Sequence, residues 1–569
     1  MTSGPKARSQ AVAELALEIP GCFDRAKRRW SSFLLLEPPI PDCSQPLAAI
    51  DLRTRRVVVN LESLVEKQLD HALEAILAHE IGHHVRYPGT LAVQARLLVL
   101  ERQLIPFEDY SLVNLFTDLM INEQLGAELS GELAMIYRVY WDAGHTARRS
   151  SLEERWSFDP AFCLYLTIYE ELWRLPRGSI VGAAAPWLDE RFAGARSDAQ
   201  LLASDLFILG PNLYTQFLFF VSVVARYVRG PDGQRPKALR PSDCSAGEPT
   251  TEDWADAMRA DAKEQEAIDR ALGARWFPEA QEERLREAHR VERRLRVLSD
   301  QPGRLERLPE VMGAHYRRQA ERFLFRPPRQ RALGEAIVPT TLTAFEPGDS
   351  VRDIDWLATL NARGPHLGAA LPEKRERVAE AEGAEVSLWR PRIEIYLDVS
   401  GSMPDPKVAE NAMTLAAQIL AIAAIRSGGS ARAILYSHEP VTYQGWARSE
   451  LEISRFLMHY IGGGTEFPFA DLDRSVREAG SDQPIRVVIT DHDFDSNVSE
   501  QPGAERRLVE PVKRSARFVL LQLRSVPERL TAYRSIGIVP IPVEDMSDFP
   551  KMAARLARAL FPEAGFAET

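Results

Sequence analysis

The segment RIEIYLDVSGSM, residues 392–403, decides the fold of the C-terminal part of this chain. It starts as an apolar strand and ends in a polar loop, a pattern typical of a buried strand. Further apolar runs follow, with helical segments between several of them: ARAILYS, IRVVIT, RFVLLQL and IGIVPIPVED. This alternation predicts a doubly wound, Rossmann-like α/β domain with a parallel sheet over residues 391–565.

Oxygen-bearing side chains gather where these strands end, and ligands of such sheets bind at the carboxyl ends of strands. The loop after the first strand carries Asp398, Ser400 and Ser402, the segment GGGTEF supplies Thr465, and Asp491 follows IRVVIT. Carboxylate and hydroxyl oxygens are hard ligands that suit Mg²⁺ or Mn²⁺. The sequence therefore predicts a magnesium site, and a metal-free domain with a polar loop is the alternative.

These three segments resemble the metal-ion-dependent adhesion site (MIDAS) of von Willebrand factor A domains, and they occur in that family's order. The resemblance covers roughly residues 391–565. It implies a binding module in which the protein leaves one position of the ion open. An Asp or Glu of a partner protein would fill that position.

The preceding segment FEPGDSVRDIDWLATLNARG, residues 345–364, resembles the P-G-D-x-x-R-x-I-D-W signature of bacterial A-domain proteins associated with MoxR-type AAA+ ATPases. The resemblance implies such an ATPase as a partner, contacted through Asp349, Arg352, Asp355 and Trp356. A purely structural collar is the alternative. We expect Arg352 to pair with Asp349 or Asp355, and the Trp356 ring to pack against the sheet.

A second motif lies far upstream, in AILAHEIGHHVRYP, residues 75–88. In a helix His79 and His83 are four residues apart and share one face, so both imidazoles can bind one Zn²⁺. Glu80 can then reach a water on the ion and accept its proton, as a general base of hydrolysis does. The alternative is a helix whose histidines are satisfied in the core or by solvent.

A third zinc ligand is expected from the mostly apolar segment SLVNLFTDLMINEQL, residues 111–125. A polar stripe inside an apolar helix needs buried partners. Asp118 is the expected ligand, with Asn122 orienting a ligand from behind, and Glu123 is the alternative ligand. His84 points about 100° away from the face of the two motif histidines, so a supporting or structural role is expected.

This half of the chain resembles bacterial metallopeptidases that combine H-E-x-x-H, a helix with a D-x-x-x-N pattern and a C-terminal von Willebrand A-like domain. The resemblance implies a mainly helical, zincin-like domain in which His79, His83 and Asp118 bind zinc. The segment 47–61 predicts a short β-hairpin before the motif, whose edge could carry an extended peptide. Tyr137 and Tyr140 are candidates for stabilising the transition state.

The chain has 569 residues, so two to four domains are expected. Composition shifts predict a zincin-like domain, a charged linker with a helical arm, a collar segment and the A domain. Their expected ranges are 1–228, 229–330, 331–390 and 391–565.

The formal net charge is −11, from 70 Lys and Arg against 81 Asp and Glu, which argues against nucleic acid and anionic membranes as partners. The four cysteines form no C-x-x-C pair, and the most apolar segment, 213–228, is short for a membrane span. We therefore expect a cytoplasmic protein.

Two functions fit these patterns. One is a zinc-dependent peptidase whose protein substrate is presented by the A domain, with a MoxR-type ATPase as partner. The other is a non-catalytic adaptor or co-chaperone of that ATPase, in which the zinc site is structural. Glu80 favours the peptidase, because a structural zinc site does not need it. A surface adhesion protein is disfavoured by the scarce cysteines.

Overall fold

The computed structural model describes residues 5–45, 47–105, 111–149, 159–228, 247–299, 308–324, 334–346, 348–363, 371–382, 390–480, 482–501 and 503–561. The chain divides into two compact units. One comprises Met1–Arg318 with Pro404–Glu410, and the other Gln319–Met403 with Asn411–Thr569. The expected linker begins at residues 229–246, which lie outside the described part.

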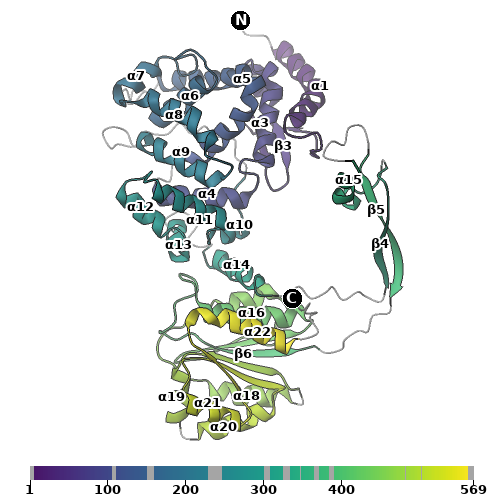
Figure 1. Cartoon of the computed structure of the whole chain (residues 1–569), viewed down its shortest axis with the longest axis vertical. Helices are drawn as coiled ribbons and strands as arrows, with labels where there is room; N and C mark the ends of the chain where they lie inside the picture. The colour runs from purple at the N-terminus through teal and green to yellow at the C-terminus, as the bar shows by residue number, and fades with distance from the viewer. Residues whose placement is uncertain are drawn as a thin grey trace. The chain divides into compact units, whose positions relative to one another are not determined.

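The first unit is mainly helical (Figure 1). Helix α3 carries the H-E-x-x-H motif and packs against both α1 and α5. The helices of its first part are α1 Pro5–Trp30, α2 Leu61–Glu66, α3 Leu73–Val85, α4 Leu91–Leu104, α5 Leu112–Arg149, α6 Pro160–Leu172, α7 Ala184–Arg191, α8 Ala195–Asp205 and α9 Leu213–Val228.

Gly82, inside the motif, explains how these helices come so close. A Cβ at Gly82 would lie 2.5 Å from Cζ2 of Trp30 on α1 and 2.8 Å from Cγ2 of Ile121 on α5. Both distances are shorter than van der Waals contact, so only a glycine permits this packing. The close approach of α5 is what brings its polar face to the motif histidines.

The expected hairpin is present. Strand β2, Ala48–Asp51, pairs antiparallel with β3, Arg56–Val59, and the two-residue β1, Ile40–Pro41, joins β3 in parallel. The strand order is β1-β3-β2, which leaves β2 at an edge. Helix α3 contacts both β2 and β3, so the hairpin lies beside the motif helix.

Further helices belong to the first unit and pack on its core. Helix α10 contacts α4 and α11 contacts α9. A buried ion cluster holds them: the Glu264 carboxylate accepts hydrogen bonds from Arg96, at 3.2 Å, and from Arg294. These helices are α10 Thr251–Ala257, α11 Ala262–Gly273, α12 Glu279–Arg286 and α13 Val291–Ser299, and α14 Leu308–Glu321 follows.

The second unit contains the predicted α/β sheet, and each predicted strand is confirmed. The sheet has the order β11-β10-β9-β6-β7-β8, in which the edge strand β8 is antiparallel and the rest are parallel. The strands are β6 Arg392–Asp398, β7 Ser430–Tyr436, β8 Val441–Thr442, β9 Ile485–Thr490, β10 Arg517–Leu523 and β11 Val539–Val543.

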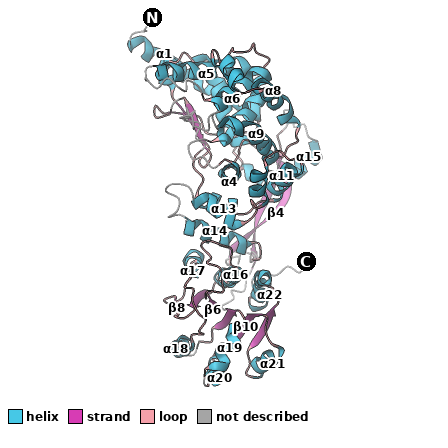
Figure 2. Cartoon of the chain, turned by 90° about the vertical axis from the view of Figure 1, so that its left-hand side faces the viewer, coloured by secondary structure: helices cyan, strands magenta, loops and turns pink. Residues whose placement is uncertain are grey.

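Helices cover both faces of this sheet (Figures 1 and 2). Helices α16, Ala412–Arg426, and α22, Phe549–Leu560, lie on one face. The opposite face carries α18 Phe469–Ala479, α19 Asp493–Glu500, α20 Ala504–Lys513 and α21 Pro527–Ser535. A short helix α17, Glu450–Leu457, contacts β7.

The collar segment forms a β-hairpin with a short helix. Strand β4, Gly334–Ala344, pairs antiparallel with β5, Glu373–Glu382, and α15, Trp356–Arg363, lies between them in sequence. Within the described ranges, no helix combines the length and the apolar character that a membrane crossing requires.

Two expectations for the collar were wrong. Asp349 pairs with Lys374, at 2.7 Å, and Asp355 pairs with Arg375, so β5 supplies the cations instead of Arg352. The Trp356 side chain is 46% exposed and is not packed into a core. The pairs fix the helix on the hairpin, which leaves the indole on the surface.

Candidate metal centres

The structure brings the two motif histidines of α3 together with one carboxylate of α5. The Nε2 atoms of His79 and His83 lie 3.6 Å and 3.3 Å from Oδ1 of Asp118. The three side chains offer ligand atoms that all lie within 4.8 Å of one another. This convergence follows from the i, i+4 spacing of the histidines and from the close packing of α5 on α3.

The outer nitrogen of each histidine has its own hydrogen-bond partner. Nδ1 of His83 lies 2.8 Å from the carbonyl oxygen of Tyr87. A carbonyl oxygen can only accept, so this Nδ1 carries the proton and Nε2 of neutral His83 keeps its lone pair. Nδ1 of His79 lies 2.8 Å from Oδ1 of Asn122, the residue expected to orient a ligand from behind.

Three tyrosines hold Asn122 in turn. Its Nδ2 donates to the hydroxyls of Tyr137, at 2.7 Å, and Tyr169, at 2.8 Å. The hydroxyl of Tyr165 lies 2.6 Å from that of Tyr169 and 3.1 Å from that of Tyr137. Because the amide nitrogen faces the phenols, its oxygen faces His79. The network therefore directs Nε2 of His79 toward Asp118.

Sequence reasoning missed Tyr165 and Tyr169, which α6 contributes. The available signal was two phenols four residues apart in a mostly apolar, buried helix, because buried hydroxyls need partners. Tyr137 was expected to be a candidate for stabilising the transition state. In the structure, its hydroxyl accepts a hydrogen bond from the Asn122 amide. Tyr140 instead has the Lys67 ammonium 5.5 Å from its ring centre.

The electrostatics favour positive charge where the three ligand atoms meet. Burial disfavours protonated His79, but the Asp118 carboxylate outweighs it and raises the pKa of His79 to about 9. Burial opposes ionisation of Asp118 too, yet both histidines hold the pKa of Asp118 well below its usual range. Nε2 of His83 and Oδ1 of Asp118 have no hydrogen-bond partner among the described residues. Two imidazole nitrogens and a carboxylate oxygen fit the donor set of Zn²⁺.

The other candidate residues take different places. Glu80 is buried beside His79, and its charge adds to the rise of the His79 pKa. Glu123 is not part of the convergent group; burial raises its pKa and the Arg86 charge opposes that rise. His84 is also outside the group, and burial lowers its pKa. The geometry thus brings Asp118, and not Glu123, to the histidines.

At the end of β6, four of the five predicted magnesium ligands form one hydrogen-bonded cluster. Oδ1 of Asp398 accepts from the backbone N–H of Ser400 at 3.0 Å. The hydroxyl of Ser402 lies 3.0 Å from that of Ser400 and donates to Oδ2 of Asp491 at 3.0 Å. Thr490, the last residue of β9, donates to Oδ2 of Asp398 at 3.0 Å and fixes that carboxylate.

The glycine-rich loop that carries Thr465 is bound to this cluster. Gly401 N–H donates to the carbonyl of Gly463 at 2.8 Å, and Gly463 adopts a φ of +85°. Asn497, which sequence reasoning missed, donates from Nδ2 to the Thr465 carbonyl at 3.1 Å and accepts from Phe467 N–H at 2.9 Å. Asn497 therefore clamps the segment around Thr465.

The charges of this cluster suit a divalent cation. Burial, reinforced by the Asp491 charge, raises the pKa of Asp398 to about 6. Two neighbouring carboxylates in a buried position are unfavourable unless a cation neutralises them. Asp491 also groups with His492 and Asp493, whose ligand atoms lie within 4.8 Å of its own. Carboxylate and hydroxyl oxygens match the preference of Mg²⁺, so the residues fit that ion.

No protein-family model matches the chain, and no curated protein matches it. Among solved structures, a von Willebrand factor type A protein from Catenulispora acidiphila shows weak similarity, with 17% sequence identity and a TM-score of 0.24. The match covers 32% of this chain and 43% of that chain, so this chain spans less than half of that protein's length.

Proposed function

We propose that this chain is a zinc-dependent metallopeptidase that docks its protein substrate or partner through a magnesium site in the α/β unit. The observation that carries the proposal is the convergence of His79, His83 and Asp118, with the Glu80 carboxylate on the next residue of the same helix. A structural zinc site has no use for that carboxylate, whereas hydrolysis needs a base there.

Each residue then has a defined task. Asn122 and the Tyr87 carbonyl hold the two imidazoles with their Nε2 lone pairs directed at the centre. Asp118 completes the set of protein ligands. Glu80 accepts a proton from the water that attacks the peptide carbonyl and delivers it to the leaving amine. A bound zinc ion supplies Lewis-acid chemistry to this reaction. The edge strand β2, beside α3, supports an extended peptide.

In the α/β unit, we propose that Asp398, Ser400, Ser402, Thr465 and Asp491 hold Mg²⁺ and that a partner's acidic side chain completes its coordination. The raised pKa of Asp398 and the mutual hydrogen bonds of the other groups support a cation at this position. A MoxR-type AAA+ ATPase is the proposed partner of the collar hairpin. The exposed apolar side chains of α15, which include Trp356 and Leu357, support a protein contact there.

A second candidate function is a non-catalytic adaptor of the same ATPase with a structural zinc site. The observation that favours it is burial, because Glu80 is 2% exposed and His79 is 8% exposed. A peptide must reach both groups, so hydrolysis requires an opening movement that structural zinc binding does not.

Cleavage of an unfolded protein separates the two functions. The full chain, loaded with zinc, is incubated with β-casein, and fragments are followed by mass spectrometry with and without a MoxR-type ATPase. The peptidase predicts that Glu80→Gln, which keeps the shape of the side chain, abolishes fragments while zinc remains bound. If the wild type and Glu80→Gln give the same fragments, or if neither gives any under all conditions, the peptidase function is refuted and the adaptor function is favoured.

The docking site has its own test. Mn²⁺, a paramagnetic substitute for Mg²⁺, is titrated into the zinc-loaded full chain and free Mn²⁺ is measured by electron paramagnetic resonance. We expect one Mn²⁺ site that Asp398→Ala removes and that Asp482→Ala, an exposed substitution in the same unit, leaves unchanged. Retention of the site in Asp398→Ala would show that the cation binds elsewhere.

A further inference from the structure

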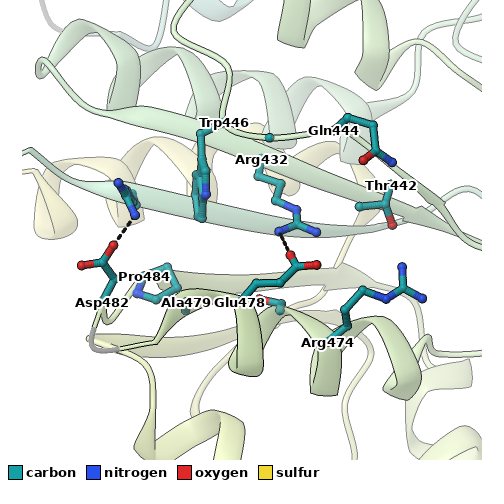
Figure 3. Close-up of a pocket in the computed structure, with 12 residues that line it drawn as sticks. Arg432, Thr442, Gln444, Trp446, Arg474, Glu478, Ala479, Asp482 and Pro484 are labelled. Atoms are coloured by element: carbon teal, nitrogen blue, oxygen red, sulfur yellow. Dashed lines mark hydrogen bonds and ion pairs between the residues drawn. The ribbon is translucent and has the colours of Figure 1, made fainter.

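The α/β unit has a recess at the opposite end of β6 from the proposed magnesium site (Figure 3). Its volume is about 190 Å³. Arg392, the first residue of β6, and Pro484, just before β9, line it, whereas Asp398 closes β6 at its other end. Arg392 and Asp398 are six steps apart along the strand, which corresponds to about 20 Å. The recess is therefore separate from the metal cluster.

A bulge in the sheet edge places an indole in this recess. Ile434 of β7 pairs with Thr442, and Ala431 pairs with Ala447. Three steps along β7 thus oppose five steps on the edge segment, so two extra residues bulge out. Gly445, with a φ of +78°, permits the bulge. Bulges of this kind re-aim side chains and are frequent beside binding sites.

The indole of Trp446 is the side chain that the bulge presents. It lines the recess together with Pro484 and Ala479, and Figure 3 shows it directed across the recess toward them. The Arg392 guanidinium lies 5.5 Å from the Trp446 ring and pairs with Asp482. Trp446, Ala479 and Pro484 therefore give one half of the recess a largely apolar lining.

The other half rests on a row of buried charges. Arg432, Glu394 and Arg486 stand side by side on β7, β6 and β9, in register. Glu394 Oε2 accepts from Arg486 Nε at 2.9 Å and from Ser475 Oγ at 2.6 Å. Arg432 Nε lies 3.7 Å from Glu394 Oε1, which is too far for a hydrogen bond.

This row leaves one residue that lines the recess, Arg432, with an unused hydrogen-bond donor. Neither Arg432 Nε nor Glu394 Oε1 has a hydrogen-bond partner within the described part of the chain. Arg432 is only 11% exposed, and its Nη1 donates to Glu478 at 2.8 Å. An unsatisfied buried guanidinium nitrogen is unfavourable, and a shift of the Arg432 side chain toward the recess would let a ligand oxygen satisfy it.

The charges on the walls point to an anion. The lining includes three guanidiniums, of Arg392, Arg432 and Arg474, and two carboxylates, of Glu478 and Asp482. Arg474 is 54% exposed, so it can turn toward a ligand at little cost, although it pairs with a neighbouring aspartate at 3.1 Å in this structure. A guanidinium can bind a carboxylate through two parallel N–H···O bonds, and Arg432 and Arg474 both line the recess.

We propose that this recess binds a small planar anion, an aromatic carboxylate in its simplest form. The ring lies against the apolar lining of Trp446 and Pro484, and the carboxylate contacts Arg432 and Arg474. A recess of this volume has room for a single ring with one acidic group. The proposal does not depend on either proposed metal centre.

Benzoate tests the proposal directly. Binding to the full chain is measured by saturation-transfer NMR in EDTA and in Mg²⁺, beside benzamide, a neutral analogue of the same shape, and inorganic phosphate, an anion without a ring. We expect millimolar benzoate binding in EDTA, and roughly tenfold weaker binding of benzamide and of phosphate. Trp446→Leu and Arg474→Gln should each weaken benzoate binding roughly tenfold. Arg477→Gln, on the same helix but outside the recess, should leave binding unchanged.

Three results would overturn the proposal. The first is benzoate binding that Trp446→Leu and Arg474→Gln do not weaken. The second is benzoate binding that requires Mg²⁺ and is lost in Asp398→Ala, which would place the carboxylate on the metal cluster. The third is phosphate or benzamide binding as strong as that of benzoate. Arg474 is largely exposed, so the Arg474→Gln variant is expected to fold and keeps the test decisive.

Discussion

The burial of Glu101 allows us to predict a change in stability whose size can be calculated. It lies near the end of α4, is fully buried, and its Oε1 accepts from the backbone N–H of Leu112, the first residue of α5, at 2.7 Å. This contact caps the helix that carries Asp118. Burial raises the pKa of Glu101 from 4.5 to about 7, although the Arg102 charge opposes the rise.

The sign of the effect follows from this direction. The folded chain holds the Glu101 proton more tightly than the unfolded chain, so folding is favoured at low pH. That stability is fully present below pH 4.5 and is lost as the pH rises to about 7. At 1.36 kcal/mol per pKa unit, the shift corresponds to a loss of about 3 kcal/mol above pH 7, as an upper value.

Replacement of Glu101 by Gln keeps an acceptor for the Leu112 N–H and removes the charge. We expect thermal melting of Glu101→Gln and the wild type to coincide near pH 4.5 and to diverge as the pH rises. Above pH 8 the first unit of the variant should melt about 5 °C higher than that of the wild type. This difference is about 3 kcal/mol divided by the unfolding entropy, which is about 2 cal/mol/K per residue over about 300 residues.

Glu190→Gln, an exposed substitution with the same change of charge, controls for net charge and should melt like the wild type throughout. The reasoning is refuted if the two melting curves of Glu101→Gln and the wild type differ by the same amount at every pH. It is also refuted if the variant is the less stable protein above pH 8.

Further predictions follow from single contacts. Asn122→Ala frees the outer nitrogen of the first motif histidine, so zinc affinity, measured by competition with a chelator, should fall about 10- to 100-fold. Gly463→Ala should weaken Mn²⁺ binding, because its φ of +85° disfavours a side chain and the new Cβ would lie 2.7 Å from Nδ1 of His438; the double variant with His438→Ala should recover part of the loss. Arg486→Met leaves the Glu394 carboxylate buried without its main partner and should cost about 3–5 kcal/mol of stability in urea unfolding, whereas the double variant with Glu394→Leu should cost much less.

The sequence predicts the α/β sheet well because its strands are buried on both faces. The segments that form β7, β9 and β10 are almost continuous apolar runs. The position of the Asp398 loop was predictable as well, because the apolar run of β6 ends there. The grouping of His79, His83 and Asp118 was also predictable, since helical periodicity places each on one face of its own helix.

Other features depend on packing that no local pattern reveals. Tyr165 and Tyr169 meet Asn122 only because α6 packs on α5. Arg432 and Arg486 meet across Glu394 because three strands distant in sequence are in register. The partners of the collar aspartates were mispredicted for the same reason, since a neighbouring strand supplied the cations in place of a local arginine.

Zinc content tests the central claim most directly, because it depends on which carboxylate completes the site. The full chain and its Asp118→Ala and Glu123→Ala variants are loaded with zinc, dialysed and analysed by mass spectrometry for metal per chain. The geometry predicts about one zinc ion in the wild type and in Glu123→Ala, and a loss of zinc in Asp118→Ala. Zinc retained by Asp118→Ala but lost from Glu123→Ala would contradict it.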